Sequence, residues 1–344
     1  MFGAYFMSIT IGNIVTKNNV FLAPMSGVTD EPFRQAAHHA GAGLVVSEMV
    51  ASEELVHQRR DMVRRAKGAK KITPFVIQLA GREAHWMIEG AKVAQGLGAD
   101  IIDINMGCPA RQVTGGLSGS ALMRNLDHAL TLIDATVAAV QIPVTLKMRL
   151  GWDDKTQNAP ELAQRAEAAG IALITVHGRT RCQFYTGKAD WKAIRAVREQ
   201  IKIPLIANGD CDSVEDAHTM MNLSGANGVM IGRGAYGRPW WPGSIAEGLK
   251  PGTGQVAPNL AETLNIVLNQ QQETLELYGA GLGNKTFRKH LGWTILRLFK
   301  QGYFDEAKLA QLRGSLLSES NNDKVSVLIK KLFHLCTQHE SLAA

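Results

Sequence analysis

Short apolar segments and longer amphipathic segments alternate along the first two thirds of the chain. Eight runs of β-branched or other apolar residues predict β-strands, at residues 20–23, 44–47, 75–79, 101–105, 144–148, 173–177, 205–208 and 229–232. Segments of helical length separate them, among them 83–97, 126–140, 159–169, 189–199 and 214–223. Eight strand–helix units in about 240 residues predict an α/β fold, a (β/α)8 TIM barrel. A doubly wound sheet is the alternative, but it rarely contains so many strands at this regular spacing.

The pattern changes after residue 241. Residues 242–258 are rich in Gly and Pro, which is typical of a linker. The remaining segments have helical periodicity and contain no strand pattern, at 261–278, 284–300, 306–315 and 324–338. We therefore expect a TIM-barrel catalytic domain over residues 1–245, a linker over 246–259 and a small all-α helical domain over 260–344.

The composition is that of a globular protein and excludes several other classes. Hydrophobic residues make up 45% of the chain and charged residues 20%, which excludes a disordered protein. No apolar run reaches the roughly 18 residues of a membrane-spanning helix, and the first residues lack the features of a signal peptide. The four cysteines form no CxxC pair, so we expect neither a disulfide framework nor a metal site. These features predict a cytoplasmic protein.

In each of five successive predicted strands, the last residue on one face is polar. These residues are Gln78, Asn105, Lys147, His177 and Asn208. Side chains two residues apart in a strand share a face, and the opposite faces carry aliphatic residues that suit packing against helices, so this polar face should point into the barrel. A set of internally hydrogen-bonded core residues is one interpretation. Five polar side chains at one depth, including a lysine, favour a flat polar ligand over the C-terminal mouth.

Glycine-containing turns follow the seventh and eighth predicted strands. They read Asn208-Gly209-Asp210 and Gly232-Arg233-Gly234. The loops after these two strands commonly bind phosphate in this fold, through backbone N–H groups that glycine leaves accessible. The alternative is that the glycines only make tight turns. A polar ring beside a phosphate site predicts a mononucleotide-like cofactor such as FMN.

Cys108 lies just beyond the fourth predicted strand, in the stretch Asn-Met-Gly-Cys-Pro. A single cysteine is usually buried and inert. In a mouth loop beside a redox cofactor, however, a proton donor or nucleophile is the better interpretation. Cys182 and Cys211 also fall on mouth loops, and a three-cysteine metal site is the alternative, although the spacing matches no known ligand pattern.

These motifs resemble those of the bacterial tRNA-dihydrouridine synthase family, most closely its B-type subgroup, over about residues 12 to 335. The matching stretches include Ala23-Pro24-Met25, Ser47-Glu48-Met49, Gln78-Leu79-Ala80-Gly81, Asp103-Ile104-Asn105-Met106-Gly107-Cys108-Pro109, Lys147-Met148-Arg149, His177-Gly178-Arg179-Thr180, Ala207-Asn208-Gly209-Asp210, Gly232-Arg233 and Arg288-Lys289-His290-Leu291-Gly292-Trp293. The resemblance implies an FMN-binding barrel with a helical tRNA-binding domain.

The resemblance also implies a reaction and a set of site residues. NADPH, or NADH, reduces FMN, the flavin passes a hydride from N5 to C6 of a tRNA uridine, and Cys108 protonates C5. The cofactor-binding residues implied are Pro24, Met25 and Ser26 under the ring, Gln78, Asn105, Lys147 and His177 beside it, and Asn208, Gly209, Asp210, Gly232 and Arg233 at the ribityl-phosphate end. Lys147 corresponds to the family lysine near flavin N1 and O2.

Basic residues cluster in two stretches that suit an RNA partner, whereas the net charge of +6 only permits one. Residues 57–71 contain Arg59, Arg60, Arg64, Arg65, Lys67, Lys70 and Lys71, and residues 279–303 contain Lys285, Arg288, Lys289, Arg297 and Lys300. A solvated face is the alternative for each stretch. Arg111, Arg179, Lys285, Arg288 and Lys289 are the predicted RNA contacts, although Arg111 and Arg179, with Arg181, suit the flavin phosphate equally.

Two other functions remain open at this point. One is an FMN barrel that reduces a free small molecule, and the other is a non-catalytic RNA-binding protein that reuses the barrel. The presence of Cys108, Lys147 and His177 argues against the second. The sequence leaves open which tRNA uridine is reduced and whether NADPH or NADH is preferred. We expect a monomer.

Overall fold

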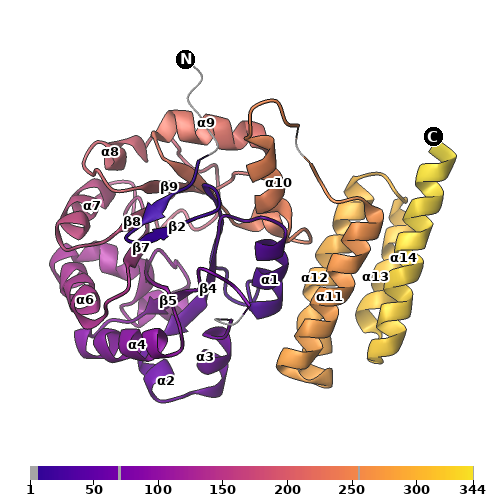
Figure 1. The fold of residues 1–344 in the computed structure, drawn as a ribbon, viewed down its shortest axis with the longest axis horizontal. Helices are drawn as coiled ribbons and strands as arrows, with labels where there is room; N and C mark the ends of the chain where they lie inside the picture. Colours follow the sequence, from indigo (N-terminus) through magenta and orange to yellow (C-terminus); the bar gives the residue numbers. More distant parts are fainter. Residues whose placement is uncertain (1–6, 69–70, 255, 344) are drawn as a thin grey trace.

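The computed structural model of the chain describes residues 7–68, 71–254 and 256–343. Eight parallel strands form a closed barrel (Figure 1): β3 (Val20–Leu22), β4 (Leu44–Ala51), β5 (Val76–Ala80), β6 (Ile101–Met106), β7 (Val144–Arg149), β8 (Leu173–His177), β9 (Leu205–Asn208) and β10 (Gly228–Ile231). Each strand pairs with the next along the chain, and β10 closes the barrel on β3. The predicted TIM barrel is confirmed.

Helices and helical turns follow the strands around the barrel. They are α1 (Glu31–His39), α2 (Ser52–Val56), α3 (Arg60–Arg65), α4 (Ala84–Gly96), α5 (Arg111–Gly115), η1 (Gly119–Arg124), α6 (Leu126–Ala139), α7 (Ala159–Ala168), α8 (Arg195–Arg198), α9 (Val214–Ser224), η2 (Arg233–Ala235) and α10 (Trp241–Gly248). No helix in the described part of the chain is long and apolar enough to cross a membrane.

Two of these helices differ from the prediction. The helix expected over 189–199 is reduced to α8, because Asp190 donates its backbone N–H to Gly178 and the N–H of Ala189 binds Asp210, which ties this segment to the mouth loops. The helix α10 occupies part of the expected linker at 242–258. Pro242 stands in its first turn, where proline begins a helix rather than ends one.

The interior of the barrel has an apolar layer beneath a polar one. The apolar layer contains Phe21, Leu44, Val46, Val76, Ile101, Leu173, Ile206 and Met230, with Ile9 and Ile11 from the segment around the hairpin of β1 (Thr10–Ile11) and β2 (Ile14–Val15) packed against it. The opposite faces of the strands, such as Ile77, Ile102 and Leu146, belong to the cluster between strands and helices. The predicted inward and outward faces are therefore confirmed.

Four helices form the C-terminal region: α11 (Leu260–Tyr278), α12 (Ala280–Lys300), α13 (Glu306–Ser318) and α14 (Asn322–Ala343). They enclose their own core, which includes Phe287, Leu291, Ile295, Ile329 and Phe333. Helix α11 packs against barrel helix α1, so this region stands beside one side of the barrel (Figure 1). Residues 1–6 of the predicted first domain, Lys70 of the first basic stretch and residue 344 lie outside the described residues.

Candidate active site

A cavity of about 950 Å³ lies at the C-terminal mouth of the barrel. All thirteen residues predicted to act in catalysis or cofactor binding line it: Pro24, Met25, Ser26, Gln78, Asn105, Cys108, Lys147, His177, Asn208, Gly209, Asp210, Gly232 and Arg233. They come from segments spread over more than 200 positions of the sequence, which the barrel brings to one place. Their individual roles remain predictions.

A chain of hydrogen bonds connects three strands at one side of the cavity floor. Asn105 donates through Nδ2 to Oε1 of Gln78 at 2.8 Å, and Gln78 donates through Nε2 to Oδ2 of Asp103 at 2.7 Å. Thr145 donates to Oδ1 of Asp103 at 2.6 Å. Burial raises the pKa of the Asp103 carboxyl, and these two donors partly counteract it. At this side of the floor, the polar residues are therefore hydrogen-bonded to one another, as the first interpretation of the ring predicted. Their partner Asp103 was not predicted from the sequence.

Asn208 organises the other side of the floor. Its Oδ1 accepts from Nζ of Lys147 at 3.1 Å and lies 3.0 Å from Nδ1 of His177, while its Nδ2 donates to the Met230 carbonyl at 2.8 Å. Because Oδ1 is an acceptor, His177 carries its proton on Nδ1, and its Nε2 faces an N–H of Arg179 at 3.3 Å. Burial, with the nearby cations, lowers the pKa of His177 well below its usual value, so the imidazole is neutral.

Lys147 supplies the positive charge of the polar ring. Burial lowers its pKa to about 8, and the neighbouring Arg149 acts in the same direction. At pH 7 the ammonium group is therefore still mostly protonated. A positive charge held in a partly apolar cavity favours an anionic or strongly polarised atom of a ligand at this point.

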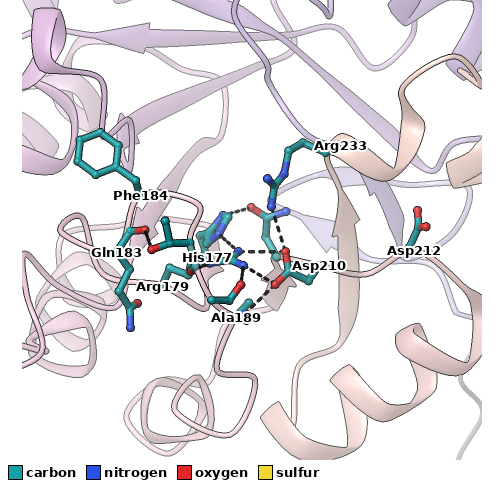
Figure 2. A network of polar contacts seen from close by, with 12 residues as sticks. His177, Arg179, Gln183, Phe184, Ala189, Asp210, Asp212 and Arg233 are labelled. Carbon is teal, nitrogen blue, oxygen red and sulfur yellow. Dashed lines mark hydrogen bonds and ion pairs between the residues drawn. The ribbon is translucent and has the colours of Figure 1, made fainter. Parts of the chain in front are cut away.

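Asp210 is the centre of an ion-pair network at the mouth, shown in Figure 2. Its carboxylate accepts from Nη1 and Nη2 of Arg179 at 3.0 and 2.5 Å, from Arg233 at 3.2 Å and from the N–H of Ala189 at 2.8 Å. Burial alone would raise the pKa of Asp210, but Arg179, the N–H of Ala189 and Arg233 together outweigh it and the pKa is lowered. Asp212 lies apart from this network in Figure 2 and pairs with Arg238.

The position of Arg179 does not fit the RNA contact predicted for it. Its side chain is 1% exposed. Besides Asp210 and His177, it donates through Nε to Thr186 and through Nη2 to Gly187. These bonds use all five N–H donors of the guanidinium, which leaves none for a phosphate. Arg179 holds Asp210 and the loop after β8 in place.

Cys108 lies partly exposed in the cavity, on a loop fixed from several directions. Oδ1 of Asn105 accepts the backbone N–H groups of Gly107 and Cys108 at 3.2 and 3.0 Å. The Cys108 carbonyl accepts the N–H and the hydroxyl of Ser120, and Nε of the buried Arg149 donates to the Gly107 carbonyl at 2.8 Å. These bonds set the position of the thiol relative to the floor of the cavity.

The other cysteines do not form a metal site with Cys108. Cys211 is buried, and burial raises the pKa of its thiol far above the usual value, so it stays protonated. Cys182 is exposed on the loop after β8. Within the described residues no group of three His, Cys, Asp or Glu side chains is arranged to hold a metal ion.

The remaining predicted RNA contacts lie outside the cavity. Arg111 is exposed at the start of α5, and Lys285 is exposed on α12. Arg288 is partly committed within the protein, since it donates to Asn284 at 3.0 Å and to the Glu319 carbonyl at 3.1 Å. Lys289 is partly buried on the same helix.

The first basic stretch contacts the residue that precedes the second stretch, although the two are about 200 residues apart in the sequence. The guanidinium of Arg64, on α3, lies 4.5 Å from the ring centroid of Tyr278, the last residue of α11. Tyr278 directly precedes the second stretch. Some of the first stretch is neutralised within the protein, because Arg59 pairs with Glu54 and Asp61. The first stretch therefore presents less net positive charge to a partner than its sequence suggests.

The comparisons identify the family. A family model described as "Dihydrouridine synthase (Dus)" matches residues 21–325. This chain belongs to the dihydrouridine synthase family. A probable tRNA-dihydrouridine synthase of Rhizobium leguminosarum bv. phaseoli is 58% identical over 281 residues, which cover 82% of this chain and 86% of the relative. A second, of Rhodobacter capsulatus, is 48% identical over 95% of this chain and 98% of the relative.

This chain is also similar to dihydrouridine synthases of the B type. The tRNA-dihydrouridine synthase B of Pseudomonas putida is 43% identical over 84% of this chain and 86% of the relative. Solved structures share the barrel fold at low identity. Histamine dehydrogenase from Rhizobium sp. 4-9 aligns with a TM-score of 0.55 and 15% identity over 72% of this chain and 48% of that chain. A 2-naphthoyl-CoA reductase aligns with a TM-score of 0.58 and 15% identity over 72% and 53%.

Thirteen further cavity-lining residues of this dihydrouridine synthase were not among the predicted site residues, and six of them have large side chains that reach the cavity from outside the predicted motifs or beside them. These six are Met49, Arg149, Phe184, Tyr185, Tyr236 and Arg297. The sequence offered a signal for Arg149, which stands two positions after Lys147 and so on the same face of β7. Tyr185 and Tyr236 lie on irregular loops, and Arg297 comes from the C-terminal region, so no strand alternation marks them.

Proposed function

We propose that this dihydrouridine synthase reduces the C5–C6 double bond of specific uridines in tRNA, with FMN bound in the cavity and NADPH or NADH as the reductant. The observation that carries the proposal is the cavity itself, which combines the polar floor, the glycine turns and Cys108. Relatives named as tRNA-dihydrouridine synthases support tRNA as the substrate. The cytoplasm as the location and a monomeric state stay predictions.

The donor set fits a flat ring joined to a phosphate. Amide, imidazole and ammonium groups lie at the floor, where they can bind the polar edge of an isoalloxazine ring. Beyond them, Arg233 and Gly234 line the cavity, and their backbone N–H groups have no acceptor among the described residues. Such N–H groups bind phosphate oxygens well. When bound, FMN supplies the hydride for C6 of the uridine.

Lys147, His177 and Asn208 orient the ring in this proposal. Lys147 presents a positive charge to the N1–O2 edge, and the shared acceptor on Asn208 keeps Lys147 and His177 at fixed positions. Gln78 and Asn105 present amide groups from the opposite side of the floor. Pro24, Met25 and Ser26 line the cavity and would supply the backbone strip under the ring. Preorganised groups of this kind lower the cost of reorganisation during the reaction.

Cys108 donates the proton that completes the reduction. A hydride at C6 and a proton at C5 together saturate the double bond, and the S–H bond of the neutral thiol supplies that proton. The thiolate that remains takes a proton back from solvent, to which the partly exposed side chain has access. Asn105 and Ser120 keep the loop in one position, so that the thiol meets the face of the uracil ring.

The C-terminal region is proposed as the tRNA-binding domain, over residues 260–344, with the catalytic domain over 1–245 and the linker over 246–259. The target uridine has to leave its stack to reach the cavity, and phosphate contacts hold the RNA while it does so. Arg111, Lys285, Arg288 and Lys289 are the proposed contacts, with Arg111 nearest the Cys108 loop. Arg179 acts in the proposal through Asp210 and not through RNA.

Mass spectrometry of nuclease-mapped tRNA tests this function. A strain without the gene should lack dihydrouridine at one or a few positions, and the wild-type gene should restore it. The Cys108→Ala gene should restore nothing, and the Cys182→Ala gene, which alters an exposed cysteine outside the cavity, should restore it fully. An unchanged dihydrouridine content in the deletion strain would exclude tRNA as the substrate.

A further inference from the structure

The loop after β10 is held by a helix of the C-terminal region. The indole of Trp293, on α12, stacks on the ring of Tyr236 with centroids 4.1 Å apart and planes 12° from parallel. The hydroxyl of Thr294 donates to the Gly237 carbonyl at 3.3 Å. Gly237 has a φ of +72°, and a Cβ at this position would lie 2.5 Å from the Trp293 carbonyl carbon, so a glycine is needed for the close approach.

Arg297 projects from the same face of α12, one turn after Trp293. Its Nε donates to the Tyr236 carbonyl and its Nη2 to the Gly234 carbonyl, both at 3.3 Å. The side chain lines the cavity beside Gly232 and Gly234. A residue of the C-terminal region is thus part of the cavity wall, at the end where the glycine turns lie.

Arg297 differs from the neighbouring arginines of the loop after β10 because it has no carboxylate partner among the residues that the structure describes. Arg233 pairs with Asp210, and Arg238 pairs with Asp212. Arg297 has no carboxylate partner in the described part of the chain, and its Nη1 group donates to no acceptor there. Its two bonds to carbonyls are long, which leaves the guanidinium free to gain a stronger, charged acceptor.

We propose that Arg297 binds the phosphate of the flavin nucleotide, so that the C-terminal region completes the cofactor site of the barrel. This inference rests on the proposed function, because it takes FMN as the ligand. The barrel then supplies backbone N–H groups and Arg233, and α12 supplies the unpaired charge. Since the phosphate contacts both parts, FMN binding and docking of α12 on the barrel stabilise each other.

The experiment compares FMN with riboflavin, which carries the same ring without the phosphate. Apoprotein is titrated with each ligand while flavin fluorescence is followed, for the wild type, Arg297→Gln and Lys300→Gln. Lys300 is exposed near the end of the same helix and outside the cavity. Loss of one charge-assisted hydrogen bond predicts a Kd for FMN raised about 10-fold or more in Arg297→Gln, with riboflavin affinity unchanged. Lys300→Gln should bind both ligands as the wild type does.

Several outcomes would overturn the proposal. Equal weakening of FMN and riboflavin binding in Arg297→Gln would make Arg297 a packing residue. Unchanged FMN affinity together with weaker tRNA binding would instead assign Arg297 to an RNA phosphate. A wild type without measurable FMN affinity would refute the proposed function itself. If Arg297→Gln does not fold, hydrogen exchange of the wild type decides: FMN should slow exchange in α12 more than saturating riboflavin does, and equal protection would contradict the proposal.

Discussion

Arg179 and Asp210 form a two-point ion pair across the mouth of the barrel, at 3.0 and 2.5 Å. The arginine comes from the loop after β8 and is buried, whereas the aspartate follows β9 and is 27% exposed. The pair therefore joins two neighbouring mouth loops directly above His177. Asp210 also accepts from Arg233 of the loop after β10, so one carboxylate fixes three loops.

Replacement of Arg179 by Ala should destabilise the protein strongly. The substitution leaves a partly buried carboxylate without its main partner and removes the donors to Thr186 and Gly187, which predicts a loss of roughly 3 kcal/mol in the free energy of unfolding. Urea denaturation of the apoprotein measures it. Arg165→Ala, which breaks exposed pairs with Asp127 and Glu161, is the control and should leave the urea midpoint unchanged. A similar midpoint for both variants would refute the role given to Arg179.

The lowered pKa of Lys147 predicts a pH-dependent stability. The folded-state pKa is about 8 and the ordinary value is 10.5, so between these values the unfolded chain binds more protons than the folded one. The free energy of unfolding of the wild type, measured relative to that of Lys147→Met, should therefore rise as the pH increases from about 8 to 10.5. Denaturation of both apoproteins across this range measures the difference. A difference that stays flat or falls would mean that the ammonium is not disfavoured by burial.

Gly119 should be required for the position of the Cys108 loop. It has a φ of +60°, and a Cβ there would lie 2.9 Å from the Cys108 carbonyl oxygen. Gly119→Ala should therefore slow dihydrouridine formation several-fold without loss of bound flavin, because the clash displaces the proton donor and not the floor of the cavity. Gly115→Ala, at a site with open space, is the matched control. Equal activity of the two variants would count against this role.

Lys285 should contribute to tRNA affinity through charge alone. It is exposed on α12 and lies outside the cavity. Lys285→Gln should weaken tRNA binding uniformly across tRNA species and reduce the slope of log Kd against log salt by about 1. Filter binding at several salt concentrations measures both quantities. Lys308→Gln, on α13, is measured in the same way for comparison. Unchanged affinity and slope in Lys285→Gln would place the RNA on another surface.

The barrel and the polar floor were predictable because both depend on local periodicity. Alternation along each strand placed Gln78, Asn105 and His177 on one face, and the closed barrel then brought them together. Partners on neighbouring strands and loops were less predictable, such as the bond from Gln78 to Asp103 and the contacts that bury Arg179. A charged residue in a loop looks the same in a sequence whether it faces RNA or a carboxylate.

The contribution of the C-terminal region to the cavity was the least predictable feature. Arg297 lies more than 60 positions after Gly234, and only the docking of α12 brings them into contact. The hairpin of β1 and β2 was also missed, since two-residue strands carry no detectable alternation. The segment 242–248 was misassigned because proline is common both in linkers and in the first turn of helices.

The central claim is that Cys108 donates a proton to uridine in a flavin-dependent reduction, and one measurement tests it directly. Purified wild-type protein and Cys108→Ala are each given FMN, NADPH and tRNA lacking dihydrouridine, and dihydrouridine is quantified by mass spectrometry while flavin absorbance is followed. The account predicts that both proteins bind FMN and that NADPH bleaches it in both, but that only the wild type forms dihydrouridine at an appreciable rate. Full dihydrouridine formation by Cys108→Ala would contradict it.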